Sequence, residues 1–291
     1  MKRSIIIVVI ISFGFSSAVL SNDISAVNDS HSSVLSGVPV QEAKVSHLMN
    51  KAENSNEFIL DRSEEINQLL AIYRGDDLVA QKKQTESLAW SGITDVRVYD
   101  EIERLLIKTN EKSTVDRLKN DAISWFLKGL SYSGNAKYVN TIENVLDKTK
   151  NSKHRKYSKE ALEYLPQYGE WNPIINSTES WNVNESGKVN RFANMIRSDV
   201  LRLKELAAKR TYGEKIHSAY LFDVIEKELL AHCADADRTS RFGTTYGFMS
   251  KALGASGDKK YAVTIQSVLD RAYNPKLKRL AKKHLREFDF K

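Results

Sequence analysis

Two stretches of this sequence repeat each other at a fixed spacing. Residues 130–162 and 253–285 align without a gap, 123 residues apart, and 14 of their 33 positions are identical. Self-similarity at a fixed period is typical of repeat architectures, in which a unit buries its apolar face only against its neighbours. The spacing therefore predicts similar units that stack to share a continuous core.

Each copy has the apolar spacing of two helices joined by a short turn. The stripes of the later copy are Tyr261, Ile265, Val268 and Leu269, then Leu277, Leu280, Ala281 and Leu285. Their i, i+4, i+7 spacing favours one buried face on each helix. Asn274-Pro275 separates the stripes, and Pro favours the end of one helix and the start of the next. The earlier copy has Ser152 in place of Pro275, and its Ile142 is expected in the core like Ile265.

A second pattern, Leu-x-x-Ser-Gly, occurs three times and ends at Gly92, Gly134 and Gly257. Glycine just after an apolar helical run suits the left-handed conformation that terminates many helices. The alternative, a phosphate-binding loop, lacks the preceding strand and the following Lys-Ser/Thr. We interpret each glycine as a helix end that leads to the next unit.

The similarity continues upstream of the two stretches, again 123 residues apart, so that the duplicated blocks cover about 86–165 and 209–288. Proline is scarce, with 4 in the chain, and runs of β-branched residues that would announce strands are missing. These features predict an all-α fold, an α-solenoid of antiparallel helix pairs over residues 41–291.

The turn and second helix resemble the HEAT-repeat family. The family pattern of an Asn/Asp-Pro turn, an apolar residue, a basic residue, Ala and Leu is matched by Asn274, Pro275, Leu277, Lys278, Ala281 and Leu285. The earlier copy matches at Asn151, Arg155 and Leu162 and departs at His154 and Ser158, and Ala272 and Thr149 replace the usual Asp of the first helix. The resemblance covers roughly residues 58–288. It implies HEAT-like helix pairs and a binding scaffold, since HEAT proteins are mostly scaffolds.

The first 21 residues have the pattern of an export signal. Lys2 and Arg3 precede an apolar run over residues 5–15, and Val19 and Ser21 suit a cleavage site. The run is shorter than the roughly 20 apolar residues that span a bilayer. We therefore expect cleavage near Ser21, a flexible polar leader over residues 22–40, no transmembrane segment in the mature chain, and a bacterial periplasmic location.

Helical periodicity stops between residues 166 and 190, where turn-forming residues surround Trp171 and Trp181. A long irregular segment inside a domain is often functional. One interpretation is that both indoles pack onto the solenoid, and burial frequencies favour it. The other is that they belong to a recognition surface, because exposed aromatic residues are frequent interface hot spots.

Basic residues cluster on the second helix of each copy. The candidate binding residues are Lys153, Arg155 and Lys156 in the earlier copy and Lys278, Arg279 and Lys282 in the later one. The formal charge of +7 becomes +5 without Lys2 and Arg3, which is too small an excess to indicate nucleic-acid binding. The clusters are either solvated helix faces or a ridge for an anionic glycan or an anionic envelope surface.

No residue cluster predicts a catalytic, cofactor or metal site. His232 and Cys233 with Asp235 and Asp237 are the one compact group of metal-ligand types, but they lack the spacing of a zinc motif. Cys233 is the single cysteine, so an intrachain disulfide is impossible. No nucleotide-binding or hydrolase motif is present.

We therefore expect an exported, non-enzymatic scaffold that binds a partner protein. Two alternatives stay open. The basic helices would bind a polyanion or the envelope surface, or the chain would have an enzymatic or lyase-like activity, as some HEAT-like relatives do. Cofactors are not expected.

Overall fold

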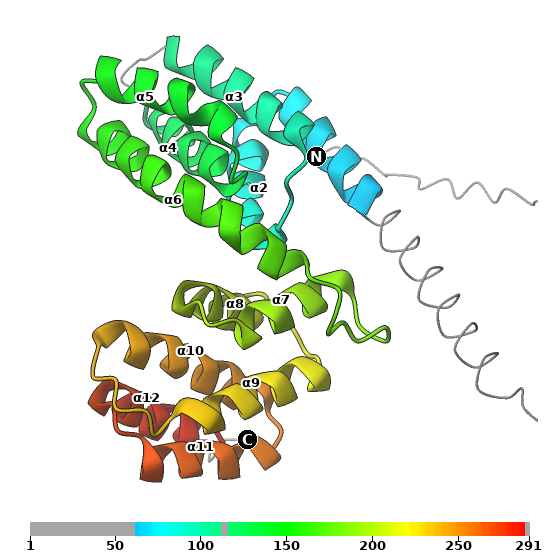
Figure 1. Cartoon of the computed structure of the whole chain (residues 1–291), viewed down its shortest axis with the longest axis vertical. Coiled ribbons are helices and arrows are strands. Elements are labelled where there is room, and N and C mark those ends of the chain that lie inside the picture. The colour runs from blue at the N-terminus through cyan, green and yellow to red at the C-terminus, as the bar shows by residue number, and fades with distance from the viewer. Residues whose placement is uncertain (1–61, 112–115, 289–291) are drawn as a thin grey trace, which may run out of the picture. The chain divides into compact units, whose positions relative to one another are not determined.

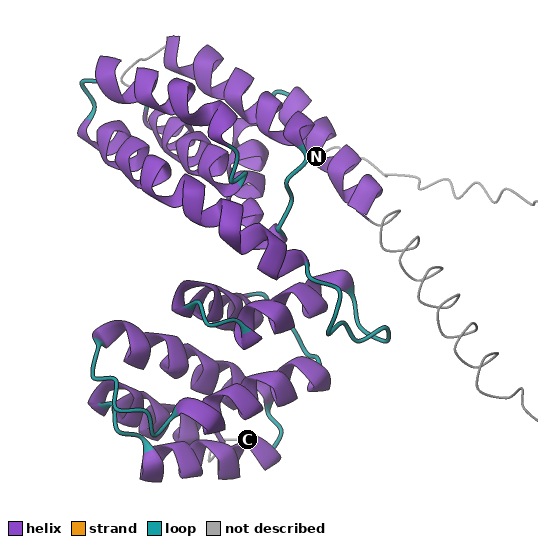
Figure 2. Ribbon diagram, in the orientation of Figure 1, coloured by secondary structure: helices purple, strands orange, loops and turns teal. Residues whose placement is uncertain are grey.

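The computed structural model describes residues 62–111 and 116–288, which belong to one compact unit of the chain (Figure 1). Every regular element in these residues is helical (Figure 2). The predicted signal peptide (1–21) and leader (22–40) lie outside the described residues. No helix in the described ranges has the length and apolar character needed to cross a membrane.

The helices follow one another with short connections. They are residues 62–74, α2 (Leu78–Ser91), α3 (Val96–Glu111), α4 (Arg117–Tyr132), α5 (Val139–Lys148), α6 (Ser152–Asn176), α7 (Gly187–Arg197), α8 (Leu201–Gly213), α9 (Ala219–His232), α10 (Ser240–Ser256), α11 (Lys260–Arg271) and α12 (Pro275–Leu285), with 3-10 turns at Ala136–Tyr138 and Arg286–Phe288.

Consecutive helices pack against each other, and so do alternate ones. The consecutive pairs include α3 with α4, α5 with α6, α7 with α8 and α11 with α12. In addition, α4 contacts both α2 and α6, and α10 contacts both α8 and α12. Each pair thus covers the apolar stripe of the next, which confirms the prediction of an all-α chain with sequentially packed helices.

The predicted helix ends are confirmed by backbone conformation. Gly92, Gly134 and Gly257 have φ angles of 66°, 66° and 78°, in the left-handed region that favours glycine. At the other end of the repeated helices, Asn151 and Asn274 cap α6 and α12. Each asparagine side chain accepts hydrogen bonds from two backbone N–H groups of the first turn, which would otherwise lack partners.

The helices recur with the spacing seen in the sequence. We call α2–α6 the first block and α8–α12 the second block. The helices α8, α9, α10 and α12 begin 123 residues after α2, α3, α4 and α6, respectively. Contacts recur as well, because Tyr138 donates to Asp100 Oδ1 at 2.9 Å and Tyr261 donates to Asp223 Oδ1 at 2.8 Å. The two blocks therefore have the same local construction.

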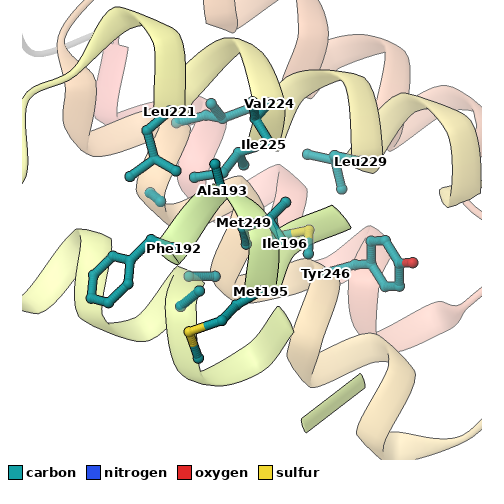
Figure 3. Close-up of a cluster of buried hydrophobic side chains, with 14 of the residues drawn as sticks. Phe192, Ala193, Met195, Ile196, Leu221, Val224, Ile225, Leu229, Tyr246 and Met249 are labelled. Carbon is teal, nitrogen blue, oxygen red and sulfur yellow. The ribbon is translucent and has the colours of Figure 1, made fainter. Parts of the chain in front are cut away.

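Apolar side chains fill the interior of both blocks. Ile142 and Ile265, the equivalent core positions expected from the sequence, are both fully buried. Figure 3 shows part of the larger cluster, where side chains of α7, α9 and α10 meet, among them Phe192, Leu221 and Met249. The cluster also includes Trp171 and Ile175, so the end of α6 belongs to the same core as the second block.

The predicted irregular segment 166–190 is wrong over most of its length, because α6 continues to Asn176 and α7 begins at Gly187. Pro166 and Pro173 lie inside α6. Each proline removes one helical hydrogen bond. They are seven residues apart and both are exposed, so water reaches the carbonyl groups that lose their partners. Only residues 177–186 connect the helices without regular structure.

Candidate functional site

A groove lies between α2, α4, α6 and α8, with a volume of about 480 Å³. This lies within the range of small-ligand sites, about 300–1,000 Å³. A second hollow of about 450 Å³ adjoins it and shares Glu86, Trp90 and Arg210 with it. The aromatic residues of the groove are Trp90, Trp125, Tyr132, Tyr164 and Tyr168, and its charged residues are Glu86, Lys128, Glu160, Glu163, Arg202 and Arg210.

The aromatic wall is fixed by contacts behind it. The Tyr168 hydroxyl donates to the carbonyl oxygen of Ala89 at 3.1 Å, which ties α6 to α2. The Tyr168 ring lies 4.9 Å from the ring of Tyr132 and 5.0 Å from that of Trp171, measured between centroids. Burial raises the pKa of Tyr168 well above its usual range, so this side chain stays neutral. The wall is therefore held in place without a ligand.

Two cations lie on aromatic rings of the groove. The guanidinium of Arg210 is 3.8 Å from the centroid of Trp90 and donates to Glu86 Oε1 at 2.6 Å. Lys128 Nζ is 4.8 Å from the ring centroid of Trp125 and 4.0 Å from that of Tyr157. Cation–π contacts of this kind hold a charged group while leaving its other donors accessible.

The charges of the groove are mixed rather than of one sign. Glu86 pairs with Arg210, and Glu160 lies 3.7 Å from Lys156. Within the described residues, neither Lys128 nor the carboxylate of Glu163 forms an ion pair, so both can meet charges of a ligand. Aromatic surface with charges of both signs suits a polypeptide better than an apolar small molecule or a polyanion.

The two tryptophans singled out in the sequence have different positions. Trp171 is buried, with 7% of its surface exposed, and packs against the aromatic wall from behind. For Trp171, this burial agrees with the interpretation of a core residue rather than with that of a recognition surface. Trp181 lies in the connection between α6 and α7 and is partly exposed, outside the residues that line the groove. The structure does not bring these two side chains together with the basic candidates in one site.

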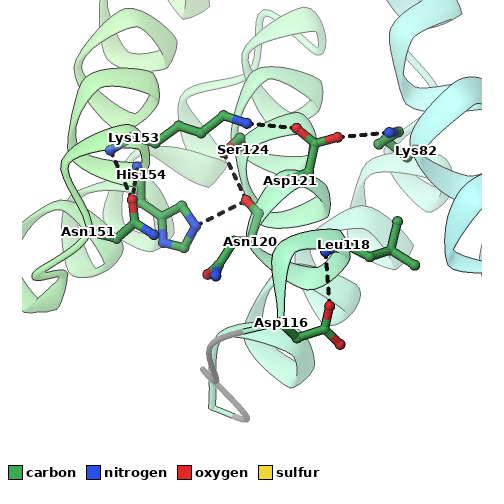
Figure 4. A network of polar contacts seen from close by, with 9 residues as sticks. All are labelled: Lys82, Asp116, Leu118, Asn120, Asp121, Ser124, Asn151, Lys153 and His154. Atoms are coloured by element: carbon green, nitrogen blue, oxygen red, sulfur yellow. Dashed lines mark hydrogen bonds and ion pairs between the residues drawn. The ribbon is translucent and has the colours of Figure 1, made fainter.

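The basic candidates of α6 are largely engaged by neighbouring groups. Lys153 pairs with Asp121 at 2.7 Å, and Asp121 also pairs with Lys82 at 2.7 Å (Figure 4). These two lysines lower the pKa of Asp121, Lys153 having the larger effect. Arg155 donates to the carbonyl oxygen of Thr149 at 2.9 Å. By contrast, Lys278, Arg279 and Lys282 on α12 are exposed, and in the described part of the chain no carboxylate pairs with them.

The departure of His154 from the apolar HEAT position has a structural explanation. The side chain is buried, and its Nε2 lies 3.1 Å from the carbonyl oxygen of Asn120 at the start of α4 (Figure 4). Burial lowers the pKa of His154 and so favours the neutral ring. The residue joins α6 to α4, and it is a packing group rather than a ligand-binding group.

A buried polar cluster lies within the second block. Lys204 Nζ bonds to Glu228 Oε1, and the Tyr246 hydroxyl donates to the same oxygen at 2.9 Å. The side chains of Lys204 and Glu228 are only 5% and 12% exposed. The residues 123 positions earlier are Gln81, Leu105 and Ile123, none of them charged. At these three positions, the second block has an ion pair with a hydrogen-bonded tyrosine, whereas the first block has uncharged and mainly apolar side chains.

The structure adds no cluster with the composition of a metal site. Across residues 62–111 and 116–288, no three His, Cys, Asp or Glu side chains are grouped so that they could hold a metal ion. His232 Nδ1 lies 2.8 Å from Asp235 Oδ2, which forms a local helix-end contact. Burial raises the pKa of the Cys233 thiol, which disfavours a reactive thiolate.

Sequence reasoning missed most of the groove. Trp90, Tyr132 and Tyr164 lie on three different helices, and no local pattern joins them. Trp125 is partly exposed and lines the groove, although its neighbours in the sequence, Ser124 and Phe126, are buried. The differences between the two copies point to these positions. Trp125 and Tyr132 of the earlier copy correspond to Phe248 and Ala255, 123 residues later.

Comparisons with known proteins give little further information. No protein-family model matches the chain, and neither does any of the curated proteins. Among solved structures, human deoxyhypusine hydroxylase in complex with glycerol is similar, with 10% sequence identity and a TM-score of 0.33. The match covers 78% of this chain and 85% of that one. A superposition at this level carries no argument about function.

Proposed function

We propose that this chain is a non-enzymatic scaffold that binds a segment of a partner protein in the groove between α2, α4, α6 and α8. The observation that carries the proposal is the lining of this groove, which combines aromatic rings with charged side chains of both signs. Aromatic residues and arginine dominate the binding energy of protein interfaces, and mixed charges select the register of a partner. The proposed setting remains the bacterial periplasm, on the basis of the N-terminal sequence.

The fixed spacing of the helices supports an origin of the two blocks by internal duplication, with HEAT-like helix pairs as the ancestral unit. In that case the groove is a later specialisation. Trp90, Glu86 and Trp125 of the first block stand opposite Gly213, Lys209 and Phe248 of the second. Since the same helices form with either set of residues, the fold does not require these three side chains, and binding is a reason for their presence.

The proposal is tested by selecting peptides from a random library against the purified full chain and measuring the affinity of the selected peptides for variants. Replacing a central interface aromatic residue typically costs at least about 2 kcal/mol of binding, or about thirtyfold in affinity. We expect this loss for Trp125→Ala. The matched control is Phe248→Ala, at the equivalent position of the second block, and it should leave the affinity unchanged.

Two results would contradict the proposal. The first is a failure to select any peptide above the background of an unrelated helical protein. The second is an equal loss of affinity in Trp125→Ala and Phe248→Ala, because the peptides would then bind elsewhere or respond to general destabilisation. Circular dichroism and the thermal midpoint of each variant separate lost binding from lost folding.

A further inference from the structure

The exposed side of α12 carries a continuous stripe of positive charge. We use the name cationic stripe for Lys278, Arg279, Lys282 and Lys283 of α12 together with Arg286, which begins the following 3-10 turn. All five are exposed, and their i, i+4 and i+8 spacing puts them on one helix face. Among the described side chains, no ion-pair or hydrogen-bond partner lies on the side chain of any of these five residues. The stripe is therefore fully available to an external partner.

This arrangement is not what helix stability alone would favour. Cations near the C-terminal end of a helix are stabilised by the helix dipole, which accounts for Lys282, Lys283 and Arg286. Lys278 lies at the end of the first turn, where the dipole still weakly opposes positive charge, and this turn contains no acidic residue to compensate. Like charges four residues apart also repel each other. An external anion would relieve both effects.

The corresponding face of α6 has a different character. Arg155, Lys156 and Lys159 occupy the positions of Lys278, Arg279 and Lys282, but Glu160 and Glu163 stand where the second block has Lys283 and Arg286. Lys156 lies 3.7 Å from Glu160. The α6 face is thus partly neutralised within the chain, whereas no described carboxylate neutralises the α12 face. The two faces lie on equivalent helices but differ in charge, so variants of α6 can serve as controls for variants of α12.

The form of the stripe indicates the kind of partner. The exposed face of α12 contributes no aromatic or aliphatic anchor of the sort that forms the centre of protein interfaces, and lysine is depleted in such interfaces. Tyr273, which precedes α12, already has the guanidinium of Arg238 on its ring, 4.7 Å from the centroid. A convex helix face also offers no enclosed site for a single small anion. An extended anionic surface can attract such a stripe by electrostatics, without an apolar anchor or an enclosed pocket on the protein.

We propose that the cationic stripe docks this protein on the surface of a bilayer that contains anionic lipids. The lipid phosphates would pair with the basic groups for which the described residues supply no carboxylate, and the groove on α2, α4, α6 and α8 would stay free for its own partner. Docking of this kind involves charge alone and leaves the helices in place. It is independent of the function proposed for the groove.

The test is co-sedimentation of the full chain with vesicles of phosphatidylglycerol and phosphatidylcholine, compared with vesicles of phosphatidylcholine alone. Each basic residue close to an anionic surface contributes about fivefold in partitioning. The variant K278Q/R279Q/K282Q should therefore bind the anionic vesicles about a hundredfold more weakly. The matched variant R155Q/K156Q/K159Q, with the same number of charges removed from α6, should lose less than tenfold.

Binding should also fall steeply as salt is raised, since exposed charges are screened beyond a Debye length of about 10 Å at 0.1 M. Equal losses in the two variants, or equal binding to both kinds of vesicle, would overturn the proposal. Tighter binding of a poly-glutamate chain or of duplex DNA than of the anionic vesicles would overturn it as well, in favour of an acidic protein or a nucleic acid. An unchanged thermal midpoint in both variants excludes misfolding as the cause.

Discussion

Gly134 lies so close to α6 that its replacement by alanine should lower the stability of the fold by a predictable amount. A Cβ atom added at Gly134 would lie 2.5 Å from the backbone nitrogen of Gly169 and 2.7 Å from its Cα. Backbone atoms cannot rotate away, so the link after α4 and helix α6 must separate. This separation weakens the hydrogen bond from Asn172 Nδ2 to the carbonyl oxygen of Tyr132, now 3.0 Å long. The left-handed φ of 66° adds strain of its own.

The expected cost of Gly134→Ala follows from these contributions. Left-handed strain for a residue with a Cβ is about 1–2 kcal/mol, and the loss of a buried hydrogen bond adds about 1 kcal/mol. We expect the free energy of unfolding, measured by urea denaturation followed by circular dichroism, to fall by about 3 kcal/mol.

Two other glycines serve as controls for this prediction. Gly92 has the same φ of 66°, but its added Cβ would meet side-chain atoms of Asn176 and Ile175 rather than backbone atoms. Gly92→Ala should therefore cost less, about 2 kcal/mol. Gly213 has no atom within 4 Å of an added Cβ, and Gly213→Ala should change stability by less than about 0.5 kcal/mol. If Gly134→Ala were as mild as Gly213→Ala, the close packing of the end of α4 against α6 would be refuted.

Two further predictions concern buried ionisable groups. Lys204→Met removes the lysine partner of Glu228, which keeps the Tyr246 hydrogen bond and has His232 Nε2 at 3.6 Å, and should destabilise the fold by about 3 kcal/mol, whereas K204Q/E228L/Y246I, which installs the residues of the first block, should cost clearly less in the same urea titration. A larger cost for the triple variant would show that the two blocks do not pack equivalently. His284 has its pKa lowered to about 4, mainly by burial and then by Lys251 and Lys283. The unfolded chain binds this proton near pH 6.5, so stability is present above that pH and is lost as the pH falls towards 4, by about 3 kcal/mol for this residue. The loss should disappear in His284→Asn, and its persistence in that variant would assign it to other groups.

The parts of the fold that could be predicted are those set by local chemistry. The left-handed glycines and the Asn274-Pro275 turn act through the backbone of their own helix, so a short stretch of sequence contains all the information. The burial of Ile142 and Ile265 follows from helical periodicity in the same way.

The parts that could not be predicted depend on contacts between distant residues or on the solvent side of a helix. Pro166 and Pro173 suggested a break in α6, yet both face water, and the helix continues beneath them. The groove requires Arg210 to meet Glu86 and Trp90, which are more than a hundred residues away in the sequence. No periodicity or motif within one helix contains that information.

The central claim, that the groove holds a partner protein, is tested most directly by site-specific photo-crosslinking in the native cells. A benzoylphenylalanine residue is placed at Trp125, inside the groove, or at Val263, which is 74% exposed and far along the chain on α11. The account predicts a discrete adduct from position 125 that is missing from position 263 and is competed by the selected peptides. Equal adducts from both positions, or none from position 125 while the chain is folded and abundant, would contradict it.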